Sequence, residues 1–287
     1  MIPAQFDYER PNTIADAVKL LAAHPDDAKL LAGGHSLIPA MKLRLAQPQL
    51  LIDIGHIKDL AYIREEGNKI LVGAMTTHYE LESSDTLKKH CPLLAECAAT
   101  IGDVQVRNKG TIGGSLAHAD PAADWPAAAI ALRAEIVAVG SKGERTINVD
   151  NFFVDLLTTA LEPGEIIREI RFEKPKSATA QAYQKVPHPA SGFAVIGIAV
   201  SLNLTADSVC ESASIGVTGV TAKAYRATAV EAALRGQKLD AQTIANAAAH
   251  ACDSIEANSD LYASADYRVQ LAKIHTQRAL QRASNRP

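Results

Sequence analysis

Two short motifs in this sequence each contain a glycine pair that leads into a serine: Ala32–Ser36 (Ala-Gly-Gly-His-Ser) and Thr111–Ser115 (Thr-Ile-Gly-Gly-Ser). Glycine has no Cβ and readily adopts positive φ, so the main-chain N–H groups of such a loop can converge on an anion. The serine adds a hydroxyl donor. Two such loops from separate segments can hold a pyrophosphate from both sides, which indicates a dinucleotide cofactor.

Either glycine pair taken singly is also typical of an ordinary turn. Neither motif has the spacing of a Rossmann dinucleotide fingerprint or of a P-loop. The hypothesis of a phosphate site therefore requires both motifs to act together, with Gly33 and Gly114 in one cleft.

The elements expected around the first motif alternate between strand and helix over residues 1–55. Thr13 is expected to cap a first helix, and the short apolar runs at 28–32 and 50–54 are expected to be strands. Ser36 is expected to cap a short second helix. This alternation predicts a small βαβ domain with a parallel sheet.

The second motif lies in a segment, 56–175, that we interpret as a mixed α+β domain. Hairpins are expected at 61–74 and 134–149, and a further strand at 165–172. Asp124 is expected as the N-cap of an alanine-rich helix that follows the motif.

A third domain is expected at 176–287, after a boundary at Lys174–Ser177. It should contain three strands and then three helices, at 182–186, 193–204, 210–217, 228–235, 240–257 and 266–283. The basic residues of the last helix are interpreted as a solvated face: Arg268, Lys273, Arg278 and Arg282.

Composition excludes some classes of partner. The chain has 287 residues, 47% of them apolar, and a formal net charge of −3, which gives no general attraction to nucleic acid or to an anionic membrane. The first residues lack the pattern of a signal peptide, and no stretch approaches the roughly 20 apolar residues of a membrane span. We therefore expect a cytoplasmic protein whose partners are proteins and small molecules.

Cysteine and histidine give no pattern of metal ligands. Cys91, Cys97, Cys210 and Cys252 are scattered without a C-x-x-C pair, so neither a zinc site nor an iron–sulfur cluster is expected on this chain. They are interpreted as buried or half-buried thiols. The nine histidines also lack metal-ligand spacing, and structural roles are expected for them.

Together with their neighbours, the glycine motifs resemble the paired flavin motifs of the FAD-binding medium subunit of molybdenum hydroxylases, in the xanthine dehydrogenase family. The aerobic carbon monoxide dehydrogenase type is the most similar. The resemblance covers essentially the whole chain and includes Gln105–Lys109, Ala117–Asp124 and Ser264–Arg268.

The resemblance implies an α+β fold. Two lobes, at 1–55 and 56–175, would sandwich FAD in the manner of the vanillyl-alcohol-oxidase-like (PCMH) fold, and 176–287 would form a three-stranded antiparallel sheet with helices. FAD would be noncovalent. Electrons would come from 2Fe–2S clusters on a small subunit, fed by a molybdenum cofactor on a large subunit, and would leave to an external acceptor. The assembly would be a dimer of heterotrimers.

The resemblance also implies a set of FAD-binding residues, with no catalytic or metal-binding residue among them. These are Lys29, Leu31, Ala32, Gly33, Gly34, His35, Ser36, Thr111, Ile112, Gly113, Gly114, Ser115, Asp124, Leu161, Lys185 and Phe193. The two glycine motifs would hold the pyrophosphate, with Lys29 and Leu31 on the approach to the first motif.

The other four residues would lie near the flavin ring system, and each has a simpler alternative. Asp124 would reach the polar part of the flavin or cap a helix, Leu161 would pack near the ring or in the core, and Lys185 would lie near the ring or be exposed. Phe193 stands where the family often has tyrosine, which keeps an aromatic ring but removes a hydroxyl.

Two other functions stay open at this point. One is a standalone flavin-dependent oxidoreductase with its own substrate, and the other is a non-enzymatic scaffold whose glycine loops are only turns. Within the leading hypothesis, carbon monoxide and aromatic or N-heterocyclic substrates are all compatible with this chain, since specificity would belong to the molybdenum subunit.

Overall fold

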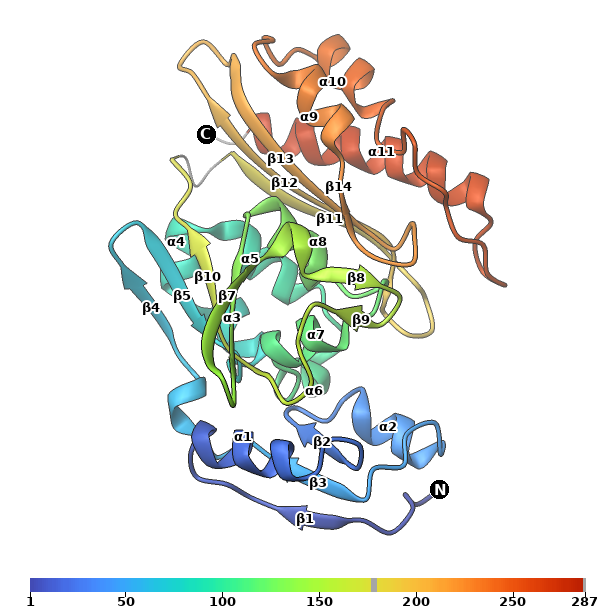
Figure 1. Ribbon diagram of the computed structural model, residues 1–287. Helices are drawn as coiled ribbons and strands as arrows, with labels where there is room; N and C mark the ends of the chain where they lie inside the picture. Colours follow the sequence, from blue (N-terminus) through green and yellow to red (C-terminus); the bar gives the residue numbers. More distant parts are fainter. Residues whose placement is uncertain (177–179, 286–287) are drawn as a thin grey trace.

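The computed structural model describes residues 1–176 and 180–285 of the 287-residue chain. Figure 1 shows three parts stacked one on another, with the N-terminal lobe at the bottom, a middle lobe, and the C-terminal domain at the top. Three separate clusters of buried apolar side chains correspond to these three parts. Within the described residues, no helix combines the length and apolarity that a bilayer crossing requires.

The N-terminal lobe is a parallel three-stranded sheet in the order β1-β3-β2. Its elements are β1 (Asp7–Glu9), α1 (Ile14–Ala23), β2 (Ala28–Leu31), α2 (Leu37–Lys42) and β3 (Leu50–Asp53). The predicted parallel βαβ arrangement is confirmed, and β1 is an addition to it. Thr13 caps α1 by accepting a hydrogen bond from the Asp16 N–H, as expected. Ser36 is the N-cap residue of the short helix α2, as expected, but its side chain makes no capping bond.

The middle lobe is built on an antiparallel sheet in the order β4-β5-β10-β6-β7. Its strands are β4 (Ile63–Glu66), β5 (Lys69–Gly73), β6 (Glu135–Gly140), β7 (Gly143–Asn148) and β10 (Ile166–Glu173), with a small pair β8 (Phe153–Asp155) and β9 (Thr158–Thr159). Both predicted hairpins are present. The helical segments are η1 (Lys58–Leu60), α3 (His78–Ser83), α4 (Asp85–His90), α5 (Pro92–Ala99), α6 (Val104–Arg107), α7 (Ile112–His118), α8 (Trp125–Ala131) and η2 (Val149–Asn151).

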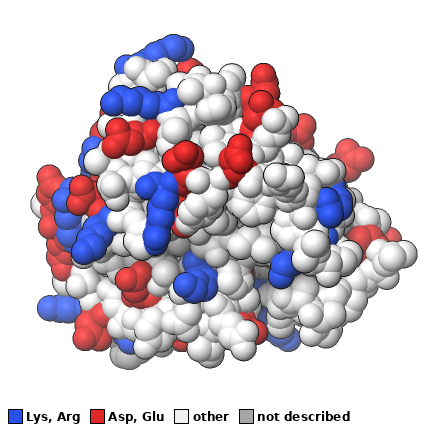
Figure 2. Space-filling model, turned by 90° about the horizontal axis from the view of Figure 1, so that it is seen from below, with Lys and Arg blue, Asp and Glu red and all other residues white. Residues whose placement is uncertain are grey.

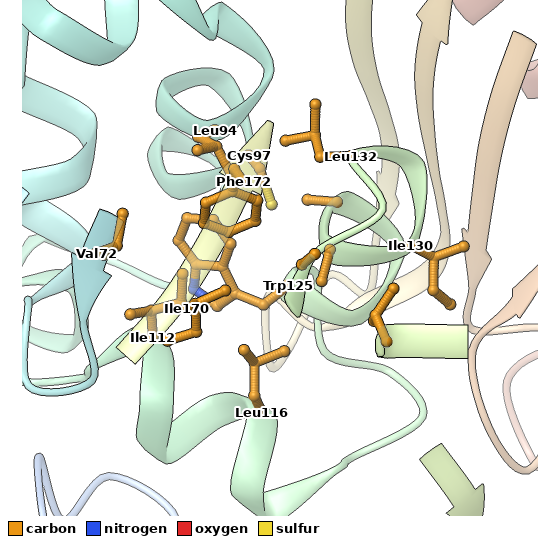
Figure 3. Close-up of a cluster of buried hydrophobic side chains, with 14 of the residues drawn as sticks. Val72, Leu94, Cys97, Ile112, Leu116, Trp125, Ile130, Leu132, Ile170 and Phe172 are labelled. Atoms are coloured by element: carbon orange, nitrogen blue, oxygen red, sulfur yellow. The ribbon is translucent and has the colours of Figure 1, made fainter. Parts of the chain in front are cut away.

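Trp125, the only tryptophan of the sequence, lies at the centre of the middle core. Figure 3 shows its indole among apolar side chains of α7 and β10, with Phe172 and Ile112 close to it. The indole Nε1–H donates to His78 Nδ1 at 3.1 Å, which satisfies its polar atom inside the core. This packing fixes the start of α8 and therefore the position of Asp124 immediately before it.

The C-terminal domain is an antiparallel sheet in the order β11-β12-β13-β14, covered by helices on one side (Figure 1). Its elements are β11 (Gln181–Pro187), β12 (Ala194–Leu204), β13 (Cys210–Thr218), β14 (Tyr225–Arg226), α9 (Thr228–Leu234), α10 (Ala241–Ala248) and α11 (Ala265–Ser284). The three predicted strands are present, and β14 adds two residues at one edge. The helix α10 is shorter than predicted.

The last helix is not a uniformly solvated basic face. Arg268 is buried at 7% exposure, and Arg282 pairs with Glu96 on α5. The prediction of a solvated face was therefore wrong for Arg268, whereas Arg282 is exposed as expected, with a side chain 44% accessible. The predicted boundary at 174–177 ends outside the described residues, and the domain limits stay predictions. Figure 2 shows acidic and basic side chains interspersed on the face seen from below, without a large area of one sign.

Candidate cofactor site

A cleft of about 870 Å³ lies between the N-terminal and middle lobes and extends to a loop of the C-terminal domain. The first glycine motif lines it on one side and the second glycine motif on the other. Residues Ser191–Phe193, from the loop that precedes β12, line it as well. The cleft therefore has walls from all three parts of the chain.

The first glycine motif lies against the second motif and against Lys109–Gly110, which directly precede it. A Cβ on Gly33 would lie 2.1 Å from the Lys109 carbonyl oxygen and 2.9 Å from Gly110 Cα. A Cβ on Gly114 would lie 3.6 Å from Ala32 Cβ. The shared cleft that the phosphate hypothesis required is thus present, and Gly33 is needed for the lobes to approach so closely.

The first motif offers main-chain donors to a ligand. In the part of the chain that the structure describes, the N–H groups of Gly33, Gly34, His35 and Ser36 have no hydrogen-bond partner. Gly34 has a φ of 76°, the left-handed region that glycine adopts without strain. His35 is exposed and its Nδ1 lies 3.1 Å from the Gly33 carbonyl oxygen. Four successive donors of this kind can bind an anion.

The second motif is built differently, and the expectation that it forms a similar nest was wrong. Thr111 caps α7 by accepting from the Gly114 N–H, and the other N–H groups of the motif also have partners within the chain. Ile112, Gly113 and Ser115 donate to the carbonyls of Thr76, Ala74 and Thr111 at 3.1, 2.9 and 3.0 Å. A Cβ on Gly113 would lie 2.5 Å from Ala74 Cβ, so this glycine permits close packing of α7 on the sheet. The Ser115 residue still lines the cleft.

Asp124 lines the cleft from the start of α8 and belongs to a buried polar cluster. Its carboxylate accepts hydrogen bonds from the Tyr183 hydroxyl (2.6 Å) and the Lys185 ammonium (2.8 Å), and both side chains of the ion pair are 4% exposed. Lys185 also donates to the Thr100 carbonyl at 2.9 Å. Asp124 is the N-cap residue of α8, as expected, but its side chain makes no capping bond and is held by Tyr183 and Lys185 instead. The exposed-lysine alternative for Lys185 was wrong.

Burial shifts the pKa of one member of this cluster, Asp124. Removal of water raises the pKa of the Asp124 carboxyl, and the adjacent Lys185 ammonium acts in the opposite direction. The ion pair places the Asp124 carboxylate at the wall of the cleft, with the Lys185 ammonium behind it.

Thirteen of the sixteen residues implied by the resemblance line the cleft. They are Lys29, Ala32, Gly33, Gly34, His35, Ser36, Thr111, Gly113, Gly114, Ser115, Asp124, Leu161 and Phe193. Leu31 lines a neighbouring pocket of about 680 Å³ on the other side of the first motif, together with Arg10, Lys42 and Lys109. Ile112 is fully buried in the middle core, and Lys185 reaches the cleft wall only through Asp124.

His78 also lines the cleft, and sequence reasoning did not single it out. It is 5% exposed, accepts a hydrogen bond from Trp125, and follows the Thr77 cap of α3. Burial lowers its pKa to about 4, with smaller contributions from the charges of His35 and Arg107. A capping box at Thr77 and Glu80 could locate the helix start, but nothing in the local pattern shows that its first residue faces a cleft.

The cysteines are packed as expected from their scatter. Cys91, Cys97 and Cys210 are buried and Cys252 is half-buried. Among the described residues, no group of three or more histidine, cysteine or acidic side chains could hold a metal ion.

Known proteins match this chain over nearly its whole length. Residues 4–175 match the family of the FAD binding domain in molybdopterin dehydrogenase, and residues 181–283 match the CO dehydrogenase flavoprotein C-terminal domain. The chain is 42% identical to the carbon monoxide dehydrogenase medium chain of Hydrogenophaga pseudoflava, over 99% of this chain and 98% of that protein. It is 36% identical to the 6-hydroxypseudooxynicotine dehydrogenase complex subunit alpha of Paenarthrobacter nicotinovorans, over 100% and 97% of the two chains.

The solved structure of the carbon monoxide dehydrogenase from Hydrogenophaga pseudoflava contains a chain with the same fold, at a TM-score of 0.95 and 43% identity, covering 99% and 98% of the two chains. The fold and the family matches thus define an FAD-binding flavoprotein. More narrowly, the chain belongs to the family of FAD-binding medium subunits of molybdenum hydroxylases, of the carbon monoxide dehydrogenase type. It is therefore an oxidoreductase subunit, and the resemblance seen in the sequence is confirmed.

Proposed function

We propose that the cleft holds FAD noncovalently, with the pyrophosphate at the first glycine motif. The observation that carries this proposal is the set of four unpartnered main-chain N–H groups at Gly33–Ser36, beside a glycine whose missing Cβ leaves room at the contact between the lobes. These groups match the acceptors of a diphosphate in number and kind. The second motif would add the Ser115 hydroxyl as a donor and would form the opposite wall of the cleft.

The rest of the cleft fits a large planar ring system. Phe193 is 44% exposed and offers an aromatic face, Leu161 offers apolar surface, and Asp124 offers a buried acceptor. When bound, FAD would supply the redox chemistry, and the protein would bind it, orient it and tune it. Lys185 would act mainly by fixing the charge and position of Asp124, because its ammonium donates to that carboxylate.

Electrons would reach this subunit from another chain. The cysteines here are scattered, and three of the four are buried, so they are not arranged as ligands of an iron–sulfur cluster. We infer that an iron–sulfur small subunit donates the electrons, that a molybdenum large subunit oxidises the substrate, and that two such heterotrimers pair. The electrons would leave to an external acceptor in the cytoplasm.

The substrate class follows only from the relatives. The chain is 42% identical to a carbon monoxide dehydrogenase medium chain, which makes carbon monoxide the first candidate. The 36% identical relative belongs to a 6-hydroxypseudooxynicotine dehydrogenase complex, so one medium-chain fold accompanies different substrates. We infer that the large subunit sets specificity and that this chain does not.

The test uses the full chain purified with added FAD. We expect bound FAD detected by its visible absorbance, release of that FAD on denaturation, and transfer of electrons from a reduced nicotinamide to an artificial dye, without turnover of carbon monoxide by the chain alone. Turnover of a small substrate by the isolated chain would favour the standalone oxidoreductase. Absence of any FAD binding would contradict the proposal and favour the scaffold.

A further inference from the structure

The segment Ser264–Arg268 lies about 150 residues beyond the second glycine motif. Its Arg268 nevertheless binds the ends of two strands that lie next to the cleft. Ser264 caps α11 by accepting a hydrogen bond from the Tyr267 N–H at 3.2 Å. The cap starts the helix so that Arg268, one turn later, points into the protein instead of toward solvent. Its exposure is 7%.

Arg268 joins three segments of the C-terminal domain. One of its terminal nitrogens donates to the Val195 carbonyl at 2.7 Å and to the Gly219 carbonyl at 2.6 Å. The other pairs with Asp260, in the loop before α11. A guanidinium group can serve these three acceptors at once because its donors form a planar fork, which a lysine ammonium cannot reproduce.

The two carbonyls that Arg268 binds belong to the strand ends that hold the segment before Asp124. The start of β12 and the end of β13 donate three kinds of hydrogen bond to Pro121–Ala123. These are Ala194 N–H to Ala122 (3.0 Å), Gly219 N–H to Pro121 (2.8 Å), and the Thr218 hydroxyl to Pro121 and Ala123 (2.6 and 2.9 Å). Asp124 follows this segment directly, so Arg268 fixes the backbone that presents its carboxylate to the cleft.

The same strand ends also position Phe193. Phe193 is two residues before Val195, in a turn closed by the His188 N–H bond to the Phe193 carbonyl (2.7 Å). The His188 ring lies 4.4 Å from the ring of Tyr262, in the loop whose Asp260 pairs with Arg268. The Phe193 turn is therefore followed by Val195, whose carbonyl accepts from Arg268, and its other end contacts Tyr262, whose N–H donates to Asp260 at 2.9 Å.

A second feature shows that the junction is closely packed. A Cβ on Gly219 would lie 2.5 Å from the Val195 carbonyl oxygen, and the φ of Gly219 is 86°. The backbone of Gly219 thus packs directly against the Val195 carbonyl, where one Arg268 nitrogen donates to the carbonyls of both residues.

We propose that Arg268 is a positioning residue for the flavin end of the cleft: it holds Asp124 and Phe193 in the arrangement that binds FAD, although it lines no part of the cleft itself. This role deepens the proposed function and rests on it.

The test compares FAD dissociation constants of the full chain and its variants. Arg268→Lys keeps the positive charge but loses the fork, and we expect it to raise the dissociation constant about tenfold, in line with the loss of one charge-assisted hydrogen bond. Arg278→Met removes an exposed arginine of the same helix and should leave the constant unchanged. Asp260→Asn removes the negative charge that pairs with Arg268 but keeps a hydrogen-bond acceptor, and it should raise the dissociation constant about twofold to threefold.

A readout that general destabilisation would not change is the coupling between Arg268 and Phe193. If the effects were independent, Arg268→Lys would raise the dissociation constant equally with and without Phe193→Ala. We expect Arg268→Lys to raise the dissociation constant clearly less in the Phe193→Ala background. We also expect Arg268→Lys alone to increase the quenching of flavin fluorescence by iodide, and this increase should be lost in the Phe193→Ala background.

The outcomes separate the two proposals. If the wild-type chain binds no FAD, the proposed function fails. If wild type and Arg278→Met bind FAD and folded Arg268→Lys binds it equally well, or with fully independent effects, the positioning role is overturned while the function stands. Should Arg268→Lys not fold, an unchanged dissociation constant for Asp260→Asn overturns the role, and a raised one supports it.

Discussion

Gly33 is a residue at which the two lobes approach closely, because a Cβ added to it would lie 2.1 Å from the Lys109 carbonyl oxygen. We predict that Gly33→Ala raises the FAD dissociation constant at least tenfold, since a Cβ 2.1 Å from that oxygen must separate the loops. Titration of the apo chain with FAD, followed by flavin fluorescence, measures the change.

The control for Gly33→Ala is Gly67→Ala, in the β4–β5 hairpin. Gly67 has a φ of 57°, and a Cβ added to it would meet no atom within 4 Å, so the substitution costs backbone energy of about 1–2 kcal/mol without touching the cleft. It should lower stability and leave FAD binding unchanged. Equal FAD affinity in both variants would show that the contact between lobes is not needed for binding.

The lowered pKa of His78 predicts that the stability of the chain depends on pH. Its pKa is about 4 in the folded chain and about 6.5 when unfolded, so below pH 6.5 the unfolded state binds the extra proton. The stability contribution is therefore complete above pH 6.5 and is lost as the pH falls toward 4. The full loss is roughly 3 kcal/mol.

Urea unfolding at a series of pH values measures this dependence. We expect His78→Asn to be less stable at pH 7 by about 1 kcal/mol, since the Trp125 hydrogen bond is weakened, but to have a shallower pH slope between 6.5 and 4. His24→Asn, at an exposed position, controls for the loss of a histidine as such. A variant slope as steep as that of wild type would show that another group titrates.

At the scale of elements, the two glycine motifs should respond differently to FAD. The N–H groups of 33–36 have no partner within the described structure, whereas those of Ile112–Ser115 donate within the chain. We predict fast hydrogen exchange at 33–36 without FAD and slow exchange at 112–115, because exchange requires an unbonded amide. FAD should slow the first segment at least tenfold and change the second much less.

Exchange measured by mass spectrometry on the apo and FAD-bound chain tests this asymmetry. Equal protection of both motifs by FAD would mean that α7 opens to bind the ligand and that the apo bonding of its first turn is not retained. Thr111→Ser, which keeps the capping hydroxyl, should preserve the slow exchange of 112–115, and Thr111→Ala should lose it.

Much of the element order could be predicted from the sequence, because its signals are local. Thr13 starts α1 by capping, and the β4–β5 and β6–β7 hairpins follow from apolar runs separated by turn residues. Ser36 shows the limit of this reasoning: the residue type favours a cap, yet its side chain makes no such bond. The short β1 and β14 have too few residues for a periodic signal and form by pairing with strands distant in sequence.

The candidate site was predictable in its residues but not in their bonding. Family motifs identified Asp124, and the cleft includes it, but its partners Tyr183 and Lys185 come from β11 of another domain. No local pattern shows such a long-range ion pair. In the same way, the composition of the second motif predicts an anion-binding nest. Its N–H groups instead donate to the carbonyls of Ala74 and Thr76, and the motif forms the start of a helix.

At the scale of the whole molecule, the buried Arg268 and the half-buried Arg226 of the C-terminal domain contact different parts of the structure. Arg268 holds the strand ends behind Asp124 and Phe193. Arg226, on β14, donates to the Ile130 carbonyl of α8 at 2.9 Å and pairs with Asp150 and Glu231. None of the partners of Arg226 lines the cleft. We therefore expect Arg226 to affect the contact between the domains and Arg268 to affect the geometry of the site.

Arg226→Met should therefore lower the free energy of unfolding by about 3 kcal/mol, because it leaves Glu231, whose side chain is 10% exposed, without its cationic partner. The FAD dissociation constant of the folded variant should stay within twofold of wild type. Urea unfolding and FAD titration on the same preparation measure both quantities. Arg268→Lys should show the opposite pattern, with weaker FAD binding at a smaller loss of stability. If Arg226→Met weakens FAD binding as much as Arg268→Lys does, any loosening of the C-terminal domain opens the cleft, and no single arginine positions it.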